Sequence, residues 1–78
     1  MLSKKAANEI ALMFNSIDVS EMMQRSVEAK RERGEITTAQ CNEQYAHWGK
    51  RALETATALK AKYGIEPVGY RRNLQEAA

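Results

Sequence analysis

The sequence predicts an all-α protein of three helices, at about 3–15, 19–33 and 38–63, followed by an extended C-terminal tail. Helical spacing of the apolar residues and recognisable start and stop signals at the segment ends support this fold class. No segment shows the apolar–polar alternation of a half-buried strand. The chain therefore divides into a helical domain at 1–64 and a tail or arm at 65–78.

The first helix is expected at about 3–15. Ser3 is a residue type that caps helix N-termini, because its hydroxyl accepts a hydrogen bond from a backbone N–H of the first turn. No glycine ends this segment, so the polar pair at 15–16 is the expected break. The apolar face of this helix comprises Ala6, Ala7, Ile10, Met13, Phe14 and Ile17.

The second helix is expected at about 19–33. Asp18 followed by Glu21 fits a capping box, in which each side chain bonds the backbone N–H of the other residue. Gly34 follows the basic last turn and is suited to the left-handed conformation that ends many helices. The apolar face comprises Val19, Met22, Met23, Ser26, Val27 and the stem of Lys30.

The third helix is expected at about 38–63. Thr37 and Gln40 repeat the capping-box pattern, while Gly64 and Pro67 end the helix. Only the residues 34–36 separate it from the preceding helix. A connection this short predicts an antiparallel hairpin of the second and third helices.

One long apolar seam dominates the third helix. Its spacings of three and four residues place all its members on one helix face. At 1.5 Å per residue this helix is roughly 39 Å long, and each of the first two is about 20 Å. The mismatch favours a homodimer whose long helices pack across a two-fold axis, with a monomeric three-helix bundle as the alternative. The seam comprises Cys41, Tyr45, Trp48, Ala52, Ala56, Leu59 and Tyr63.

Composition narrows the class of protein. The chain has 78 residues, a formal net charge of +2 and a single cysteine, Cys41, so it forms no intramolecular disulfide. We expect Cys41 to be a buried structural residue. No apolar run approaches the roughly 18 residues of a membrane span, and the N-terminus lacks the apolar region of a signal peptide. The expected location is therefore the cytoplasm.

No set of residues predicts catalysis or a cofactor. His47 is the only histidine, and Glu43 and Arg51 lie one turn away from it on either side. Such i,i+4 neighbours are typical of a solvated helix face. A metal site needs more ligands, and a general base needs a nucleophile to serve. We expect neither enzyme activity nor a bound metal or cofactor.

The tail is the expected partner-binding element, because tyrosine and arginine are enriched at binding hot spots. The tail residues singled out are Tyr70, Arg71, Arg72 and Leu74. Four further basic residues are possible contacts to nucleic acid, namely Lys50, Arg51, Lys60 and Lys62. The third helix, however, presents too few base-reading side chains for a recognition helix, so nucleic acid is not the favoured partner.

These observations favour a small helical protein-interaction module, a homodimeric inhibitor or adaptor that binds and occludes another macromolecule. Short anti-defence and regulatory proteins of phages and mobile elements belong to this class. The alternatives are a nucleic-acid-binding helical protein and an oligomer that holds a small nucleotide-like ligand between its subunits. Interhelical pockets are common ligand sites, but no residue here specifies the ligand.

Overall fold

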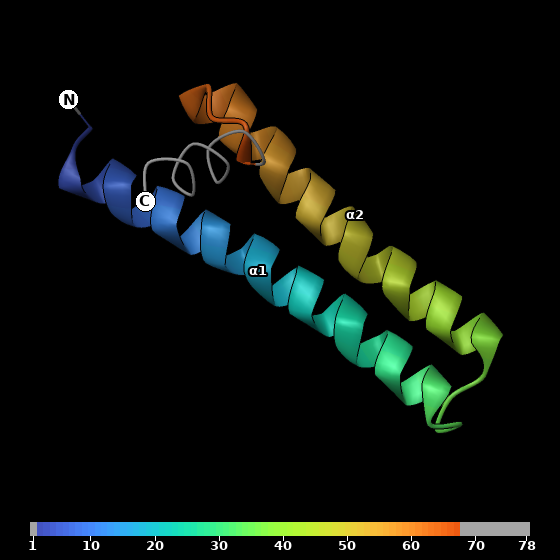
Figure 1. Ribbon diagram of the computed structural model, residues 1–78. Coiled ribbons are helices and arrows are strands. Elements are labelled where there is room, and N and C mark those ends of the chain that lie inside the picture. Colours follow the sequence, from blue (N-terminus) through green and yellow to red (C-terminus); the bar gives the residue numbers. More distant parts are fainter. Residues whose placement is uncertain (1, 68–78) are drawn as a thin grey trace.

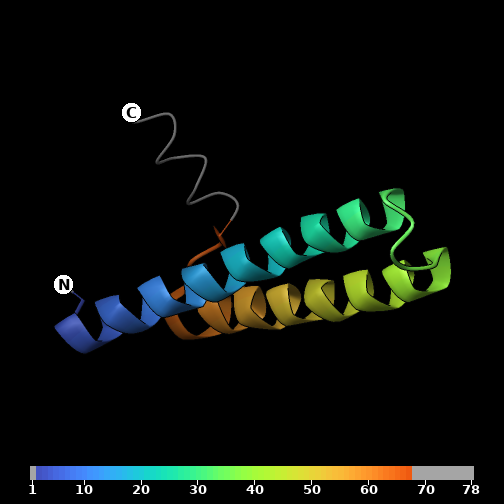
Figure 2. The same ribbon diagram turned by 90° about the horizontal axis from the view of Figure 1, so that it is seen from below.

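Residues 2–67 fold into a hairpin of two long helices. The computed structural model describes residues 2–67, which contain helix α1 (Lys4–Glu32) and helix α2 (Thr38–Tyr63). The two helices run antiparallel, side by side, and a tight turn joins them at one end of the molecule (Figures 1 and 2). Within residues 2–67 there is no strand.

The expectation of three helices is wrong, because α1 runs without a break through residues 3–15 and 19–33. The segment before Gly34 contains neither glycine nor proline, the two residues that interrupt helices. The Ser20 hydroxyl donates to the Ser16 carbonyl oxygen over 3.0 Å, so both groups are paired inside the helix. A break here would expose unpaired backbone groups, whereas polar residues inside a helix cost only a few tenths of a kcal/mol each.

The other helix ends lie where the sequence places them. The Ser3 hydroxyl accepts from the N–H of Ala6, and Thr37 with Gln40 forms the complete capping box. Gly34 and Gly64 have φ angles of 76° and 69°, the left-handed conformation that glycine adopts without strain. After α1, the backbone N–H groups of Gly34 and Glu35 donate to the carbonyls of Arg31 and Lys30, the Schellman pattern.

The core is thin and lies along the line where the two helices meet. Among residues 2–67 it contains four apolar side chains and one serine that are buried: Ile17, Ser20 and Val27 from α1, and Cys41 and Leu59 from α2. The Ser20 side chain is 1% exposed, although it is polar. Its hydroxyl is satisfied by the bond to Ser16, and burial therefore leaves no polar group unpaired there.

A close approach of the two helices lies at Gly49, at about the same level of the hairpin as Ser20. The Gln24 side-chain amide donates to the backbone carbonyl of Tyr45 over 3.2 Å and so links α1 to α2. A Cβ atom at Gly49 would lie 3.0 Å from that amide nitrogen. Glycine inside a helix costs about 1 kcal/mol relative to alanine, and the room it leaves for Gln24 explains its presence.

The continuous α1 also removes the expected mismatch in helix length. With 29 and 26 residues, α1 and α2 are roughly 44 and 39 Å long, so α1 accompanies α2 along its whole length. The α2 seam therefore packs against α1 of its own chain. A dimer built from two α2 helices is no longer needed to cover the seam.

Proline substitution tests the continuity of α1. In the three-helix arrangement Val19 would be the first residue of a helix, where proline is tolerated. In α1 it is an interior residue, and we expect Val19→Pro to destabilise the fold by about 3 kcal/mol or more. Thr38→Pro is the control, because Thr38 is the first residue of α2 and the extended Thr37 before it suits proline. Circular dichroism should show lost helicity for Val19→Pro only, and equal helicity in both variants would contradict a continuous α1.

Truncating the most buried leucine tests the interhelical core. Leu59 is fully buried, whereas Leu53 in the same helix is 67% exposed. We expect Leu59→Ala to lower the free energy of unfolding by about 2–5 kcal/mol and Leu53→Ala by about 0.5 kcal/mol or less. Urea denaturation followed by circular dichroism measures both changes. Similar losses in the two variants would show that α2 does not pack on α1 through Leu59.

Candidate interaction surface

The two halves of α1 place their apolar residues on roughly opposite sides of the helix. Successive helical residues are about 100° apart, which puts Ile10 and Ile17 on one side and Val19 and Met22 nearly opposite. A single neighbouring helix cannot cover both sides. In the structure α2 covers Ile17, which is buried, and leaves Val19 and Met22 exposed.

The exposed residues form a strip along α1. We call Leu12, Val19 and Met22 the α1 strip; their side chains are 69%, 38% and 54% exposed. The spacings of seven and three residues align them along the helix. Most residues that share this side between positions 12 and 26, over roughly 21 Å, are uncharged, namely Asn15, Ser16, Met23 and Ser26. Asp18, one turn before Met22, borders the strip on its other edge.

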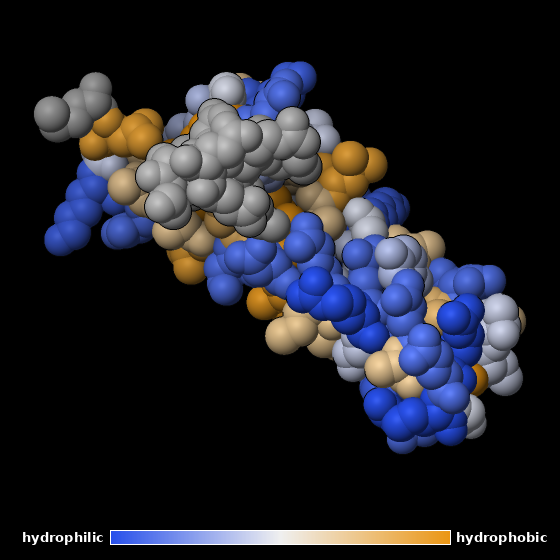
Figure 3. Space-filling model, viewed as in Figure 1, coloured by the Kyte–Doolittle hydropathy of each residue, from blue (hydrophilic) through white to orange (hydrophobic). Residues whose placement is uncertain are grey.

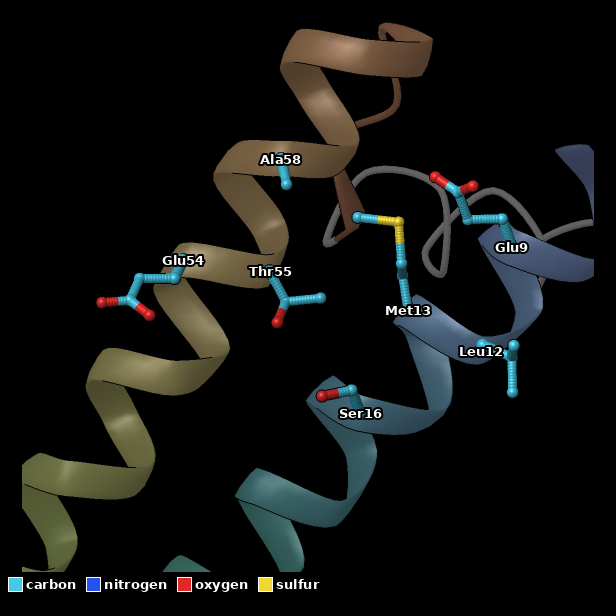
Figure 4. Close-up of a pocket in the computed structure, with 7 residues that line it drawn as sticks. All are labelled: Glu9, Leu12, Met13, Ser16, Glu54, Thr55 and Ala58. Carbon is cyan, nitrogen blue, oxygen red and sulfur yellow. The ribbon is translucent and has the colours of Figure 1, made fainter.

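An open groove of about 360 Å³ lies between the helices beside this strip. In Figure 4, Met13 of α1 and Thr55 of α2 point toward one another across the gap, whereas Leu12 turns outward to the rim. The small side chains of Ser16 and Ala58 leave the groove shallow and accessible. Its full lining comprises Glu9, Leu12, Met13, Ser16, Glu54, Thr55 and Ala58.

The two ends of the hairpin differ in surface character. The turn end is mostly hydrophilic, and apolar side chains gather toward the half that holds the N-terminus of α1 (Figure 3). A second hollow runs along that half of α1, beside Lys4, Lys5 and Asn8, and shares Glu9 and Leu12 with the groove. Leu12 therefore stands between two hollows at the apolar end of the molecule.

Sequence reasoning did not find this surface. It assigned Val19 and Met22 to the core-facing side of a separate helix and did not single out Leu12. The signal was nevertheless present in the sequence. The apolar face changes sides near residue 18 in a segment without glycine or proline, and a continuous helix with such a change must leave one face uncovered.

The seam predicted for the third helix lies along the α2 surface that meets α1. Cys41 and Leu59 are buried in the core, while Tyr45 is 41% exposed at the edge of the seam. The other members are half-buried, namely Trp48, Ala52, Ala56 and Tyr63. Cys41 carries a free thiol. It fills a core position directly after the capping box.

Three of the four candidate basic contacts interact with groups of the same chain. Lys60 forms an ion pair with Glu66 over 2.9 Å, and Lys62 pairs with Glu9. The Arg51 guanidinium lies 5.5 Å from the centre of the Trp48 ring, a cation–π distance. Lys50 is exposed on α2. The predicted tail residues Tyr70, Arg71, Arg72 and Leu74 lie outside the described residues.

The described part of the chain contains no group of three or more His, Cys, Asp or Glu side chains that would hold a metal ion. His47 is exposed and packs edge-on against the Trp48 ring, with 5.1 Å between ring centres. Glu43 and His47 help to line a polar hollow of about 380 Å³ on α2, where no nucleophile accompanies them. Neither α1 nor α2 has an apolar stretch of the length that a membrane span requires.

Comparison of the chain with known protein families, with curated proteins and with solved structures finds no match. The description of the α1 strip and its groove therefore rests on their geometry alone. They form an apolar surface, bordered by the carboxylates of Glu9, Asp18 and Glu54, on a long antiparallel helical hairpin.

An exposed ion pair joins the helices at the open end of the hairpin. The Lys62 ammonium donates to the Glu9 carboxylate over 2.5 Å, and the residues are 53 positions apart in the chain. This hydrogen bond lowers the pKa of Glu9 below its ordinary value and raises the pKa of Lys62. The pair holds the N-terminal half of α1 against the last turn of α2.

The pKa of Glu9 reports whether this pair forms. Since the pKa of Glu9 is lowered in the folded state, the ion pair stabilises the fold fully above the ordinary value of 4.5. This stabilisation is lost as pH falls through the lowered pKa of Glu9. The stabilisation that the Lys62 ammonium contributes is lost as pH rises through the raised pKa of Lys62.

We expect Lys62→Gln to return the pKa of Glu9 toward 4.5, measured by NMR titration of the carboxyl carbon. Lys60→Gln is the control and leaves Glu9 unchanged; a similar rise in both variants would argue against the pair.

Proposed function

We propose that this protein is a small helical interaction module, of the inhibitor or adaptor type, which acts by binding another protein chain through the α1 strip. The observation that supports this most directly is the exposure of Leu12, Val19 and Met22 along one side of α1. Scattered surface hydrophobic residues are ordinary, but an aligned apolar face on a helix is typical of a binding surface.

The spacing of the strip favours a helical partner. Leu12, Val19 and Ser26 are seven residues apart, and Ser16 and Met23 fall between them at the alternate positions of a heptad. Side chains at these positions insert between those of a neighbouring helix. The groove beside Leu12 accepts a further side chain, because Ser16, Thr55 and Ala58 line it with small groups.

Nucleic acid receives less support as the partner. Lys60 and Lys62 face carboxylates of their own chain, and the α1 strip offers no charge to a phosphate backbone. A free, buried cysteine suits the reducing conditions of the cytoplasm, which we propose as the location.

Capture with matched variants tests the proposed function. The full chain, carrying an affinity tag, is incubated with an extract of its native source, and the retained proteins are compared among wild type, Met22→Glu and Leu53→Glu. We expect Met22→Glu to lose the retained partner, because a charge in an apolar interface has no compensating group. Leu53→Glu is the matched control, since Leu53 is equally apolar, is exposed and lies outside the strip.

Circular dichroism of both variants must first show unchanged helicity. Partner binding that survives Met22→Glu would show that the α1 strip is not the binding surface. Loss of the retained material after nuclease treatment would favour the nucleic-acid alternative instead.

A further inference from the structure

We propose that the C-terminal segment 68–78 docks on its own hairpin, along the flank that lies opposite the groove. In this position Arg71 and Arg72 pair with carboxylates of α1, and Tyr70 packs beside Phe14. The inference is independent of the proposed function, because it uses no residue of the α1 strip and its occupant belongs to the same chain.

The hairpin has a second flank, away from the groove. Ser16 and Ala58 line the groove, one from each helix. The residues two positions before them, Phe14 and Ala56, are turned by about 200° around their helices and so belong to the other flank. Two acidic residues follow Phe14 at spacings of four and three and share its side of α1. We call this surface the second flank; its members are Phe14, Asp18, Glu21 and Ala56.

The described part of the chain ends at this flank. After α2, residues 64–67 turn back beside the helix (Figure 1). Glu66 forms an ion pair with Lys60 over 2.9 Å, and Pro67 lines a hollow of about 260 Å³ together with Ala56, one turn nearer the turn end. At Pro67 the chain is therefore directed toward the turn end of the hairpin, parallel to α1.

Two interhelical contacts show what lies beside Pro67 on α1. The Glu9–Lys62 ion pair and the hydrogen bond from Gln24 to α2 fix which residues of the antiparallel helices lie at the same level. Counting from either contact, Ala56 lies opposite Phe14 or within one residue of it. The segment 68–78 therefore starts at the level of the Phe14 ring.

The carboxylates of the second flank lie within reach of the segment. Asp18 and Glu21 are four and seven residues beyond Phe14, about 6 and 10 Å further along α1. Arg71 and Arg72 follow the described chain end by four and five residues, which span up to roughly 13–18 Å when extended. Since packed helix axes are about 8–10 Å apart, this length is enough to cross from α2 to both carboxylates.

The order of charges on the segment complements the order on the flank. The segment carries two arginines and then a glutamate, whereas α1 carries two carboxylates and then an arginine. Because the chain at its described end runs parallel to α1, opposite charges meet in sequence. Arginine pairs with carboxylates through two parallel hydrogen bonds, which gives such contacts a defined geometry. The residues compared are Arg71, Arg72 and Glu76 of the segment and Asp18, Glu21 and Arg25 of α1.

Tyr70 supplies the apolar part of the contact. It follows Pro67 by three residues, and Phe14, at the same level, is half-buried. Aromatic rings pack favourably edge to face or offset, so the two rings suit one another. The core among residues 2–67 has only five buried side chains, and a chain this short gains from a further apolar contact.

NMR relaxation of the backbone amides of the full chain tests the docking. We expect order parameters of about 0.85 for residues 70–74, the value of rigid backbone, whereas a free chain end gives values below about 0.6. Arg71→Glu combined with Arg72→Glu should lower them below about 0.6, because like charges then face one another. Nuclear Overhauser contacts between the rings of Tyr70 and Phe14 should disappear in the same variant.

A charge exchange tests which flank holds the segment. Asp18→Lys combined with Glu21→Lys should also release it, and adding the two arginine-to-glutamate changes should restore the order parameters, because opposite charges meet again. Recovery also shows that the exchanged hairpin folds. Glu43→Lys combined with Glu54→Lys is the matched control, since it exchanges two exposed carboxylates of α2 that lie away from the second flank.

Three results overturn the proposal. The first is an order parameter below about 0.6 for residues 70–74 of the wild type. The second is a rigid segment that the Asp18 and Glu21 exchange does not release, whether or not the control exchange releases it. The third is an order parameter that falls on dilution, because the segment would then be bound by a second copy of the chain.

Discussion

The structure depends on one constraint, which is that a helix can cover only one side of its neighbour. Helix α2 presents a single apolar seam, and α1 meets it with Ile17, Ser20 and Val27. The apolar residues of α1 change sides midway, so the contact that buries Ile17 leaves Val19 exposed. The thin core and the uncovered α1 strip both follow from this arrangement.

The continuity of α1 explains why the chain accepts an uncovered apolar face. Ending the helix near residue 16 would let both faces turn toward α2, but it would leave backbone groups at two new helix ends without partners. No glycine or proline offers an inexpensive break, and Ser20 satisfies its hydroxyl within the helix. The exposed strip costs little free energy when another chain covers it, whereas the unpaired backbone groups would remain.

The sequence patterns predicted the helix ends that depend on local chemistry. The continuity of α1 was missed, because it depends on the absence of any glycine or proline between residues 4 and 32. Gly34, Gly64 and the Thr37–Gln40 capping box act through their own backbone geometry, so their sequence patterns were sufficient. The similar pattern at Asp18 and Glu21 lacked a preceding stop and did not begin a helix. The α1 strip could not be predicted from the three-helix reading, because it exists only when the two halves of α1 share one axis.

Binding and folding are coupled in such a molecule. At the turn end, the Schellman pattern after α1 and the capping box of α2 fix the backbone of both helices. At the open end, the exposed Glu9–Lys62 ion pair links the helices, and an open groove separates them beside Leu12. Exposed ion pairs contribute little to stability, so the interhelical contact of the open half depends mainly on the buried Leu59. A partner that bound the strip, as proposed, would stabilise the folded state by an amount that rises with the logarithm of its concentration relative to its dissociation constant. The apolar face that the isolated hairpin leaves uncovered is therefore the place where such a partner would add to its stability.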